Sequence, residues 1–197
     1  GAMIASKFSY LGGFEGTSNV YAGYLHGVPV SGTQAHSFIM SFEKEEDIEF
    51  SRKLKDVDLL EASMKYRQEL GWTDTNMGEL YAFISFAFAY PDAFSSLIDS
   101  YSTMNSGIKN YLIVSLVLKD LGFKAMGVRL DSGDLAQLSK DCKKLMAETG
   151  QKYGHDFTYM NVVASNDINE KTLTQLIENN HQIDVFGIGT NLVTCQA

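Results

Sequence analysis

The sequence predicts an α/β fold in which parallel strands alternate with helices. Two observations support this. From Phe94 onward, short apolar runs that suit strands alternate three times with helical patterns, and the series ends on a strand. The chain also has 197 residues, 45% hydrophobic and 20% charged, which is ordinary for one sizeable globular domain. Parallel βαβ units of this kind form either an open doubly wound sheet or a (β/α) barrel.

The N-terminal part of the chain is rich in glycine and aromatic residues. Residues 14–27 predict a turn and then a short helix, with Thr17 or Ser18 as the N-cap and Gly27 as the stop. Residues 28–32 predict a short strand.

The remaining elements follow from charge and apolar spacing. The highly charged residues 43–56 predict a solvated loop or an exposed helix. The apolar patterns predict helices at 57–70, 76–89, 105–122, 133–150 and 167–180, and strands at 94–100, 123–130, 159–165 and 183–189.

Short polar or glycine residues stand at the carboxyl ends of all four strands, where parallel α/β folds gather their chemistry. Arg129 and Asp131 lie one pleat apart, so their side chains point the same way. A cation and a carboxylate on one face of the sheet suit a ribose phosphate ligand. The arginine would bind the phosphate, and the aspartate would bind the ribose hydroxyls or Mg²⁺. The alternative is that Asp131 or Ser132 only caps the next helix, which leaves Arg129 unexplained.

The other strand ends are less specific. Gly187, Gly189 and Thr190 can let backbone N–H groups approach a phosphate, or can be a plain strand end. Asp167 and Glu170 have the spacing of a capping box, which favours a helix start there and leaves Ser165 and Asn166 open. Asp99 at the first strand end is ambiguous by itself.

His36 stands in the stretch SGTQAHSFIMSF, between a Gly-Thr turn and an apolar run. Such a histidine can be a satisfied core residue, a proton carrier, a metal ligand or a nucleophile. The sequence contains no HExxH motif, Cys/His cluster, nucleophile elbow or Walker A loop that would decide the matter.

The bulk properties exclude several classes of function. A formal net charge of −8 shows no basic excess for nonspecific nucleic-acid binding. No apolar run reaches membrane-spanning length. Cys142 and Cys195 fit no metal-ligand spacing, and two isolated thiols suit a reducing cytoplasm.

Three strings together, SYLGGFEGTSNVYAGYLHGVPVSGTQAHSF, GVRLDSGDL and FGIGTNLVTC, resemble the nicotinate phosphoribosyltransferase family in sequence and order. The resemblance implies an irregular (β/α) barrel-like fold. It also implies formation of nicotinate mononucleotide and pyrophosphate from nicotinate and phosphoribosyl pyrophosphate, the first step of NAD salvage from nicotinate. ATP is a co-substrate there, Mg²⁺ is the cofactor, and the full-length enzymes are usually homodimers.

The resemblance also implies roles for single residues. His36 falls on the histidine that ATP phosphorylates, and Asp99 falls on an acidic residue near the pyrophosphate and the metal. We expect Asp99 to hold one nitrogen of His36. The remaining positions fall on or beside the phosphate and ribose site: Arg129, Asp131, Ser132, Ser165, Asn166, Gly187, Gly189 and Thr190.

Ser18 bears on the choice of base. Nicotinamide phosphoribosyltransferases resemble this chain at FEGTSNV but carry an aspartate at the position of Ser18. A carboxylate accepts a hydrogen bond from an amide and repels nicotinate, whereas a serine can donate to a carboxylate. Ser18 therefore favours nicotinate. A related phosphoribosyltransferase for nicotinamide or quinolinate remains an alternative, although the two carboxylates of quinolinate should demand more basic residues than the chain shows. A non-catalytic module that binds phosphate ligands or pairs with a partner chain is the other alternative.

The extent of the resemblance predicts a fragment. Residues 1–3 are typical of an expression-tag remnant, and residues 4–197 correspond to part of the family's catalytic barrel domain. The family's N-terminal domain and C-terminal remainder have no counterpart in the sequence. We therefore expect an incomplete barrel with little or no activity by itself.

Overall fold

The chain contains a four-stranded parallel sheet with its strands in sequence order. A computed structural model describes residues 1–48 and 52–194. The strands are β3 (Ser95–Leu97), β4 (Gly127–Leu130), β5 (Asn161–Ala164) and β6 (Val185–Phe186), paired in the order β3-β4-β5-β6. The order never reverses, as it would at the switch point of a doubly wound sheet, so the sheet has the order of barrel strands. The predicted α/β fold with an incomplete barrel-like sheet is confirmed.

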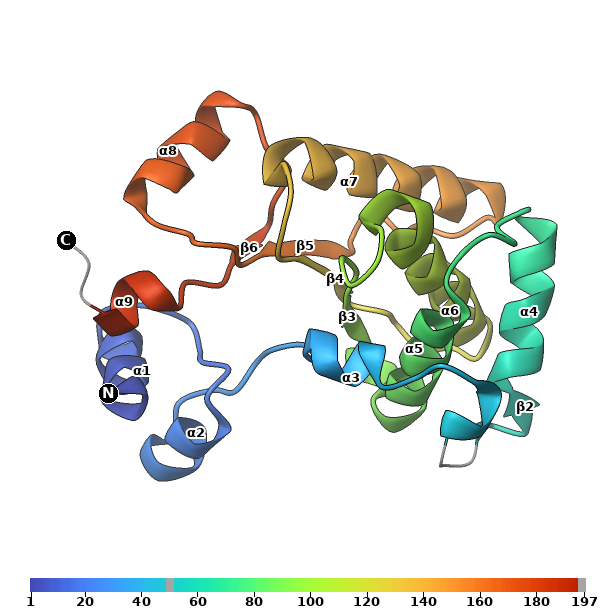
Figure 1. Cartoon of the computed structure of the whole chain (residues 1–197), viewed down its shortest axis with the longest axis horizontal. Helices are drawn as coiled ribbons and strands as arrows, with labels where there is room; N and C mark the ends of the chain where they lie inside the picture. Colours follow the sequence, from blue (N-terminus) through green and yellow to red (C-terminus); the bar gives the residue numbers. More distant parts are fainter. Residues whose placement is uncertain (49–51, 195–197) are drawn as a thin grey trace.

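Three helices connect these strands, as the alternating pattern predicts (Figure 1). They are α6 (Ile108–Asp120), α7 (Leu135–Lys152) and α8 (Glu170–Glu178). Helix α6 is apolar nearly all round and lies between α7 on one side and α4 (Leu59–Glu69) and α5 (Met77–Ala89) on the other. A helix of this kind belongs inside a core. The fully buried side chains of Phe83, Phe94 and Tyr111 mark the centre of that core.

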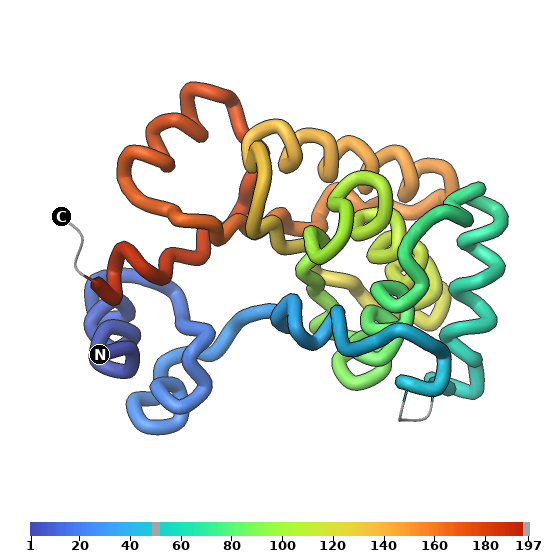
Figure 2. The backbone as a smooth tube through the Cα atoms, viewed as in Figure 1, coloured from blue at the N-terminus to red at the C-terminus, as the bar shows by residue number. Residues whose placement is uncertain are grey.

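The N-terminal part forms three short helices, α1 (Ala2–Leu11), α2 (Val20–His26) and α3 (His36–Met40). Figure 2 shows α1 beside the last helix of the described chain, α9 (Thr190–Thr194), while α3 reaches across to α5. Helices α1 and α2 expose several large apolar side chains to solvent, among them Phe8, Leu11, Val20 and Tyr24.

Three expectations for this part are corrected. Helix α1 has no counterpart among the predicted elements. Helix α2 ends at Gly27 as predicted, but its N-cap is Asn19, which accepts from the N–H of Ala22; Thr17 Oγ1 instead accepts from Asn19 N–H. The strand expected at 28–32 is reduced to one parallel bridge between Val30 and Thr17.

The charged stretch 43–56 contains a 3₁₀ turn at Glu45–Asp47 and then a small antiparallel hairpin of β1 (Lys53–Leu54) and β2 (Val57–Asp58). The hairpin replaces part of the expected loop or helix; residues 49–51 lie outside the described residues. Its two turn residues, Lys55 and Asp56, have φ of 48° and 65°, which charge patterning cannot predict.

Two further short helical turns flank β3. A 3₁₀ turn covers Pro91–Ala93, and a π-helical turn, η3, covers Thr103–Gly107 directly before α6. Single π turns inside helices are frequent at functional sites.

None of the helices in the described parts of the chain combines the length and the apolar character that a membrane span needs.

Burial raises the pKa of the Cys142 thiol to about 12, so this cysteine is an unreactive core residue. Cys195 lies outside the described residues.

Candidate active site

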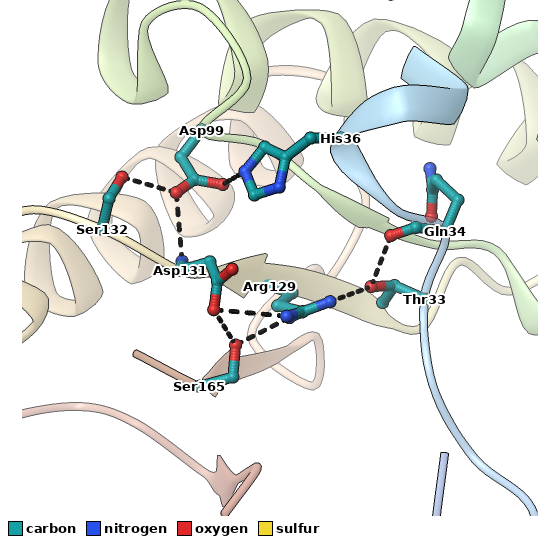
Figure 3. Close-up of polar contacts among 8 residues, drawn as sticks. All are labelled: Thr33, Gln34, His36, Asp99, Arg129, Asp131, Ser132 and Ser165. Carbon is teal, nitrogen blue, oxygen red and sulfur yellow. Dashed lines mark hydrogen bonds and ion pairs between the residues drawn. The ribbon is translucent and has the colours of Figure 1, made fainter. Parts of the chain in front are cut away.

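The carboxyl edge of the sheet brings together side chains that are far apart in the sequence. Asp99 follows β3, Arg129 is on β4, Asp131 follows β4 and Ser165 follows β5 (Figure 3). Parallel strands end at the same edge of a sheet, so the residues that follow them meet there. His36 approaches this edge from the first residue of α3.

His36 and Asp99 face each other. His36 Nε2 lies 3.3 Å from Asp99 Oδ1, and the imidazole is 43% exposed whereas the carboxylate is only 2% exposed. The predicted contact between the two side chains is therefore confirmed. No hydrogen bond to Asp99 Oδ1 is formed among the described residues, so the contact has the distance but not the alignment of a hydrogen bond. Contacts of this kind often tighten only when a ligand is bound.

The other oxygen of Asp99 is held by the loop that follows β4. Asp99 Oδ2 accepts hydrogen bonds from Ser132 Oγ at 2.5 Å and from the backbone N–H of Asp131 at 3.2 Å. These donors fix the rotation of the carboxylate, so Oδ1 remains directed at His36.

A second polar group lies beside the pair of His36 and Asp99. It consists of Arg129, Asp131 and Ser165, and we call it the arginine group. Arg129 Nη2 lies 3.2 Å from Asp131 Oδ1, and Arg129 Nε donates to Ser165 Oγ at 2.7 Å. Ser165 in turn donates to Asp131 Oδ1 at 2.5 Å. Arg129 and Asp131 are about a quarter exposed, so this arginine is paired but still accessible to a ligand. The prediction that the two side chains point the same way is confirmed.

Sequence reasoning missed the residues just before His36. Thr33 Oγ1 accepts from Arg129 Nη1 at 3.4 Å (Figure 3). The buried side chain of Gln34 donates to Ser96 Oγ at 2.5 Å. Both contacts join the segment before α3 to the sheet. The Gly-Thr turn was visible in the sequence, but its partner on β4 is 96 positions away.

Helices begin after β4 and β5 as expected, but their N-cap residues differ from the predicted ones. The N-cap of α7 is Asp134, which accepts from Gln137 N–H, so neither Asp131 nor Ser132 serves as that cap. The predicted capping box of Asp167 and Glu170 is wrong: the N-cap of α8 is Asn169, which accepts from Thr172 N–H.

The remaining predicted site residues lie around this centre. A side chain on Gly187 would come within 3.2 Å of Ser165 Cβ, so this glycine packs directly beside the arginine group. Gly189 and Thr190 begin the next turn and are exposed, as is Asn166 after β5. Ser18 is exposed in the N-terminal part and lies close to Gly32, the neighbour of Thr33.

The carboxylates at the strand ends decide whether the site can hold Mg²⁺. The described residues contain no group of three or more His, Cys, Asp or Glu side chains that could hold a metal. Mg²⁺ usually takes only one or two carboxylates, together with water and the phosphates of a substrate. Asp99 fits that need, because its buried Oδ1 accepts no hydrogen bond among the described residues.

A sequence-ordered parallel sheet with His, Asp and Arg at its carboxyl edge defines an α/β protein with a barrel-type active site. A sequence model of the nicotinate phosphoribosyltransferase (NAPRTase) family matches residues 2–196. The chain belongs to this family.

Individual relatives agree with this assignment. A nicotinate phosphoribosyltransferase from Dictyostelium discoideum is 49% identical over all of this chain and 34% of its own length. One from Caenorhabditis elegans is 44% identical over 100% of this chain and 38% of its own length. The crystal structure of human nicotinic acid phosphoribosyltransferase superposes with a TM-score of 0.84 at 38% identity, over 96% of this chain and 40% of that one. The chain thus spans about two fifths or less of the length of these proteins.

Proposed function

We propose that this chain carries the phosphohistidine and phosphoribosyl-binding part of an ATP-dependent nicotinate phosphoribosyltransferase. Such an enzyme forms nicotinate mononucleotide and pyrophosphate from nicotinate and phosphoribosyl pyrophosphate, the first step of NAD salvage from nicotinate. The proposal depends mainly on the contact of His36 Nε2 with Asp99 Oδ1. This contact lies beside the arginine group of Arg129, Asp131 and Ser165, and the chain belongs to the nicotinate phosphoribosyltransferase family.

The geometry favours one nitrogen of His36 as the nucleophile. Nε2 faces the Asp99 carboxylate, so the proton of the neutral ring sits on Nε2 and the lone pair is on Nδ1. Nδ1 attacks the γ-phosphorus of ATP, a P–N bond forms, and the bond from phosphorus to the bridging oxygen breaks as ADP leaves. Asp99 keeps the tautomer and stabilises the charge that develops on the ring.

Phosphoribosyl pyrophosphate lies at the neighbouring arginine group in this proposal. Arg129 takes a phosphate of the ligand, and Asp131, held by Ser165, takes the ribose hydroxyls. Ser132 holds Asp99 beside them and completes the proposed binding group. Backbone N–H groups of the loop after β6 hold the 5′-phosphate. That loop includes Gly187, Gly189 and Thr190, and Asn166 faces the same phosphate from the end of the neighbouring strand β5 in this proposal.

Asp99 is the residue we assign to Mg²⁺. The ion supplies positive charge that stabilises the departing pyrophosphate. The chain's own residues position the ribosyl carbon between that leaving group and the pyridine nitrogen, which attacks it. Their contribution is positioning and electrostatics, because no proton transfer is needed at this carbon.

Nicotinate is the proposed base because Ser18 can donate a hydrogen bond to its carboxylate, and because the relatives above are named for nicotinate. Competition between nicotinate and nicotinamide for the binary complex with phosphoribosyl pyrophosphate separates the two substrates. We also propose that the enzyme acts as a homodimer, as the family resemblance implies.

The decisive test is phosphorylation of His36. The chain is incubated with Mg²⁺ and γ-labelled ATP beside a His36→Ala variant, and the label is tested for stability in acid and in base. We expect label that is lost in acid, is stable in base and is absent from the variant. The variant His155→Ala is the matched control, because it removes a histidine that faces Asp120 elsewhere in the fold.

The Dictyostelium relative makes a negative result informative. It is assayed in parallel, with and without an alanine at the position that aligns with His36. Label on the relative alone would mean that the phosphotransfer needs parts of the protein beyond this chain. Absence of label from both proteins, or label that survives the alanine substitution, overturns the proposal.

A further inference from the structure

Glu79 is a buried carboxyl group that the proposed reaction does not use. It stands in the first turn of α5 and its side chain is completely inaccessible to solvent. One of its oxygens, Oε2, accepts hydrogen bonds from Ser106 Oγ at 2.5 Å and from Asn110 Nδ2 at 3.0 Å. Burial of a carboxyl group costs free energy of folding, so a buried carboxyl group with two specific hydrogen-bond partners calls for an explanation.

These partners tie the start of α5 to the π-helical turn η3 and to the start of α6. Ser106 lies in η3, and its hydroxyl also accepts a hydrogen bond from the backbone N–H of Asn76 at 2.9 Å. Asn110 lies in α6 and donates from the same Nδ2 to the backbone oxygen of Asn76 at 2.9 Å. Glu79 is therefore the shared acceptor of a network that fixes η3 from the side of α5.

The turn η3 in turn fixes the backbone that carries Asp99. A Cβ on Gly107, the last residue of η3, would lie 1.9 Å from the carbonyl oxygen of Ile98. Ile98 is the residue directly before Asp99. Only a glycine allows this close approach, so a displacement of η3 is passed straight to the Asp99 backbone.

Electrostatics agree with this placement. Burial, and after it the nearby charge of Asp99, raise the pKa of Glu79 to about 7, while the hydrogen bonds from Ser106 and Asn110 work in the opposite direction. Glu79 Oε1 and Asn110 Oδ1 have no hydrogen-bond partner among the described residues. A neutral Glu79 adds a donor to this cluster and places no second negative charge behind Asp99.

We propose that Glu79 is a positioning residue for Asp99: through Ser106 and Gly107 it holds the segment 99–107 so that the Asp99 carboxylate faces His36. The inference rests on the proposed function, because it is there that Asp99 and His36 act as the reacting pair. Glu79 itself touches neither residue in any contact described above, so it acts through the segment rather than on the substrate.

Two variants of Glu79 separate positioning from bulk stability. Glu79→Gln keeps the size of the side chain and an oxygen that can accept from Ser106 and Asn110. Glu79→Leu removes that acceptor, so the Ser106 hydroxyl loses the group to which it donates, while Asn110 Nδ2 keeps only its weaker anchoring to Asn76 and Ser106. Leu176→Ala is the control for general destabilisation, because it removes buried apolar contacts in α8, far from η3 (Figure 1). All measurements are made at temperatures at which Glu79→Leu and Leu176→Ala are folded to the same extent.

Three readouts are compared. Hydrogen exchange measured by mass spectrometry reports protection of the amides in 99–107, crystal structures report the distance from Asp99 Oδ1 to His36 Nε2, and the labelling assay reports the maximal rate and the half-saturating ATP concentration for His36. For Glu79→Leu we expect hydrogen exchange in 99–107 to rise about tenfold and the distance from Asp99 Oδ1 to His36 Nε2 to exceed its present 3.3 Å. The maximal rate of labelling should fall about 10- to 100-fold, with little change in the half-saturating ATP concentration. Glu79→Gln and Leu176→Ala should stay within about threefold of the unchanged chain in exchange and in maximal rate, and should keep the Asp99–His36 distance.

The inference is overturned if a folded Glu79→Leu variant keeps both the protection of 99–107 and the Asp99–His36 distance, or if Glu79→Gln fails as badly as Glu79→Leu. If Glu79→Leu does not fold, Ser106→Ala replaces it, because it removes the hydroxyl that links Glu79 to Asn76 N–H. Exchange and the crystal distance need no ATP. They therefore test the positioning role even if His36 is never phosphorylated, which would refute the proposed function alone.

Discussion

Ser132 Oγ donates a hydrogen bond of 2.5 Å to Asp99 Oδ2, although the two residues are 33 positions apart in the sequence. The bond links the end of β3 to the loop after β4, across two neighbouring strands. It leaves Asp99 Oδ1 as the oxygen that faces His36. The expected effects of substitutions at Asp99 and Ser132 depend on this hydrogen bond.

The first prediction concerns Asp99. Asp99→Asn keeps the shape of the side chain but can present an N–H group to His36, which favours the wrong tautomer of the ring. We expect the rate of His36 labelling by γ-labelled ATP to fall by up to about 10⁴-fold, the loss that the same substitution of a tautomer-fixing carboxylate causes in another enzyme. Ser132→Ala leaves the second donor, Asp131 N–H, in place and should cost clearly less. Equal losses in the two variants would contradict the assigned role of Asp99.

The second prediction concerns Arg129. Arg129→Met removes a cation that we expect to contact a phosphate of phosphoribosyl pyrophosphate. Charged hydrogen bonds of this kind are worth about 1.5–3 kcal/mol, so the dissociation constant should rise about 10- to 100-fold in calorimetric titration. Lys143→Met is the control with the same change in net charge, because Lys143 pairs with Asp184 and the backbone oxygen of Met160 instead. Similar weakening in both variants would show that only the overall charge matters.

The third prediction concerns pH and Glu79. The pKa of this carboxyl is raised by burial to about 7 in the folded chain, from an ordinary value of 4.5, so the folded state binds the proton more tightly. Its favourable contribution to the free energy of unfolding is complete below about pH 4.5 and is lost as the pH rises through about 7. The difference is about 3 kcal/mol for a shift of this size.

Urea unfolding at a series of pH values tests this. Glu79→Gln cannot lose a proton, so its stability relative to the unchanged chain should increase by about 3 kcal/mol from pH 5 to pH 8.5 and then level off. Comparison of the two proteins at each pH cancels the titration of all other groups. A difference that does not change with pH would mean that Glu79 titrates normally.

The fourth prediction concerns the choice of base. Ser18→Asp places a carboxylate where we expect the carboxyl group of nicotinate to be recognised. Competition binding in the presence of phosphoribosyl pyrophosphate should shift the preference toward nicotinamide by about tenfold or more. Ser31→Asp, which adds the same charge nearby, is the control. An unchanged preference in Ser18→Asp would remove Ser18 from the base site.

The parallel sheet and the cluster at its edge could be predicted because both depend on local patterns. Apolar runs such as 159–165 mark strands, and parallel strands necessarily end at one edge. This is why Asp99, Arg129, Asp131 and Ser165 could be placed together before any distance was known.

Other features depend on tertiary contacts that leave no local trace. Thr17, Ser18 and Asn19 are all good N-cap residues, and the fold selects Asn19. Glu79 lies near the start of a mostly apolar helix, where an acidic residue is normally exposed, and its burial is accompanied by hydrogen bonds from Ser106 and Asn110. The predicted roles of Gly187, Gly189 and Thr190 stay predictions, because they concern a ligand rather than the chain.

The contact between Gly107 and the carbonyl oxygen of Ile98 has a genetic consequence. Any change in the first or second base of a glycine codon brings in a residue with a Cβ or ends the chain, and a Cβ has no room there. Position 107 should therefore tolerate only silent third-base changes when the gene is mutagenised at random and survivors are selected. The neighbouring exposed position Tyr101 should vary freely in the same pool.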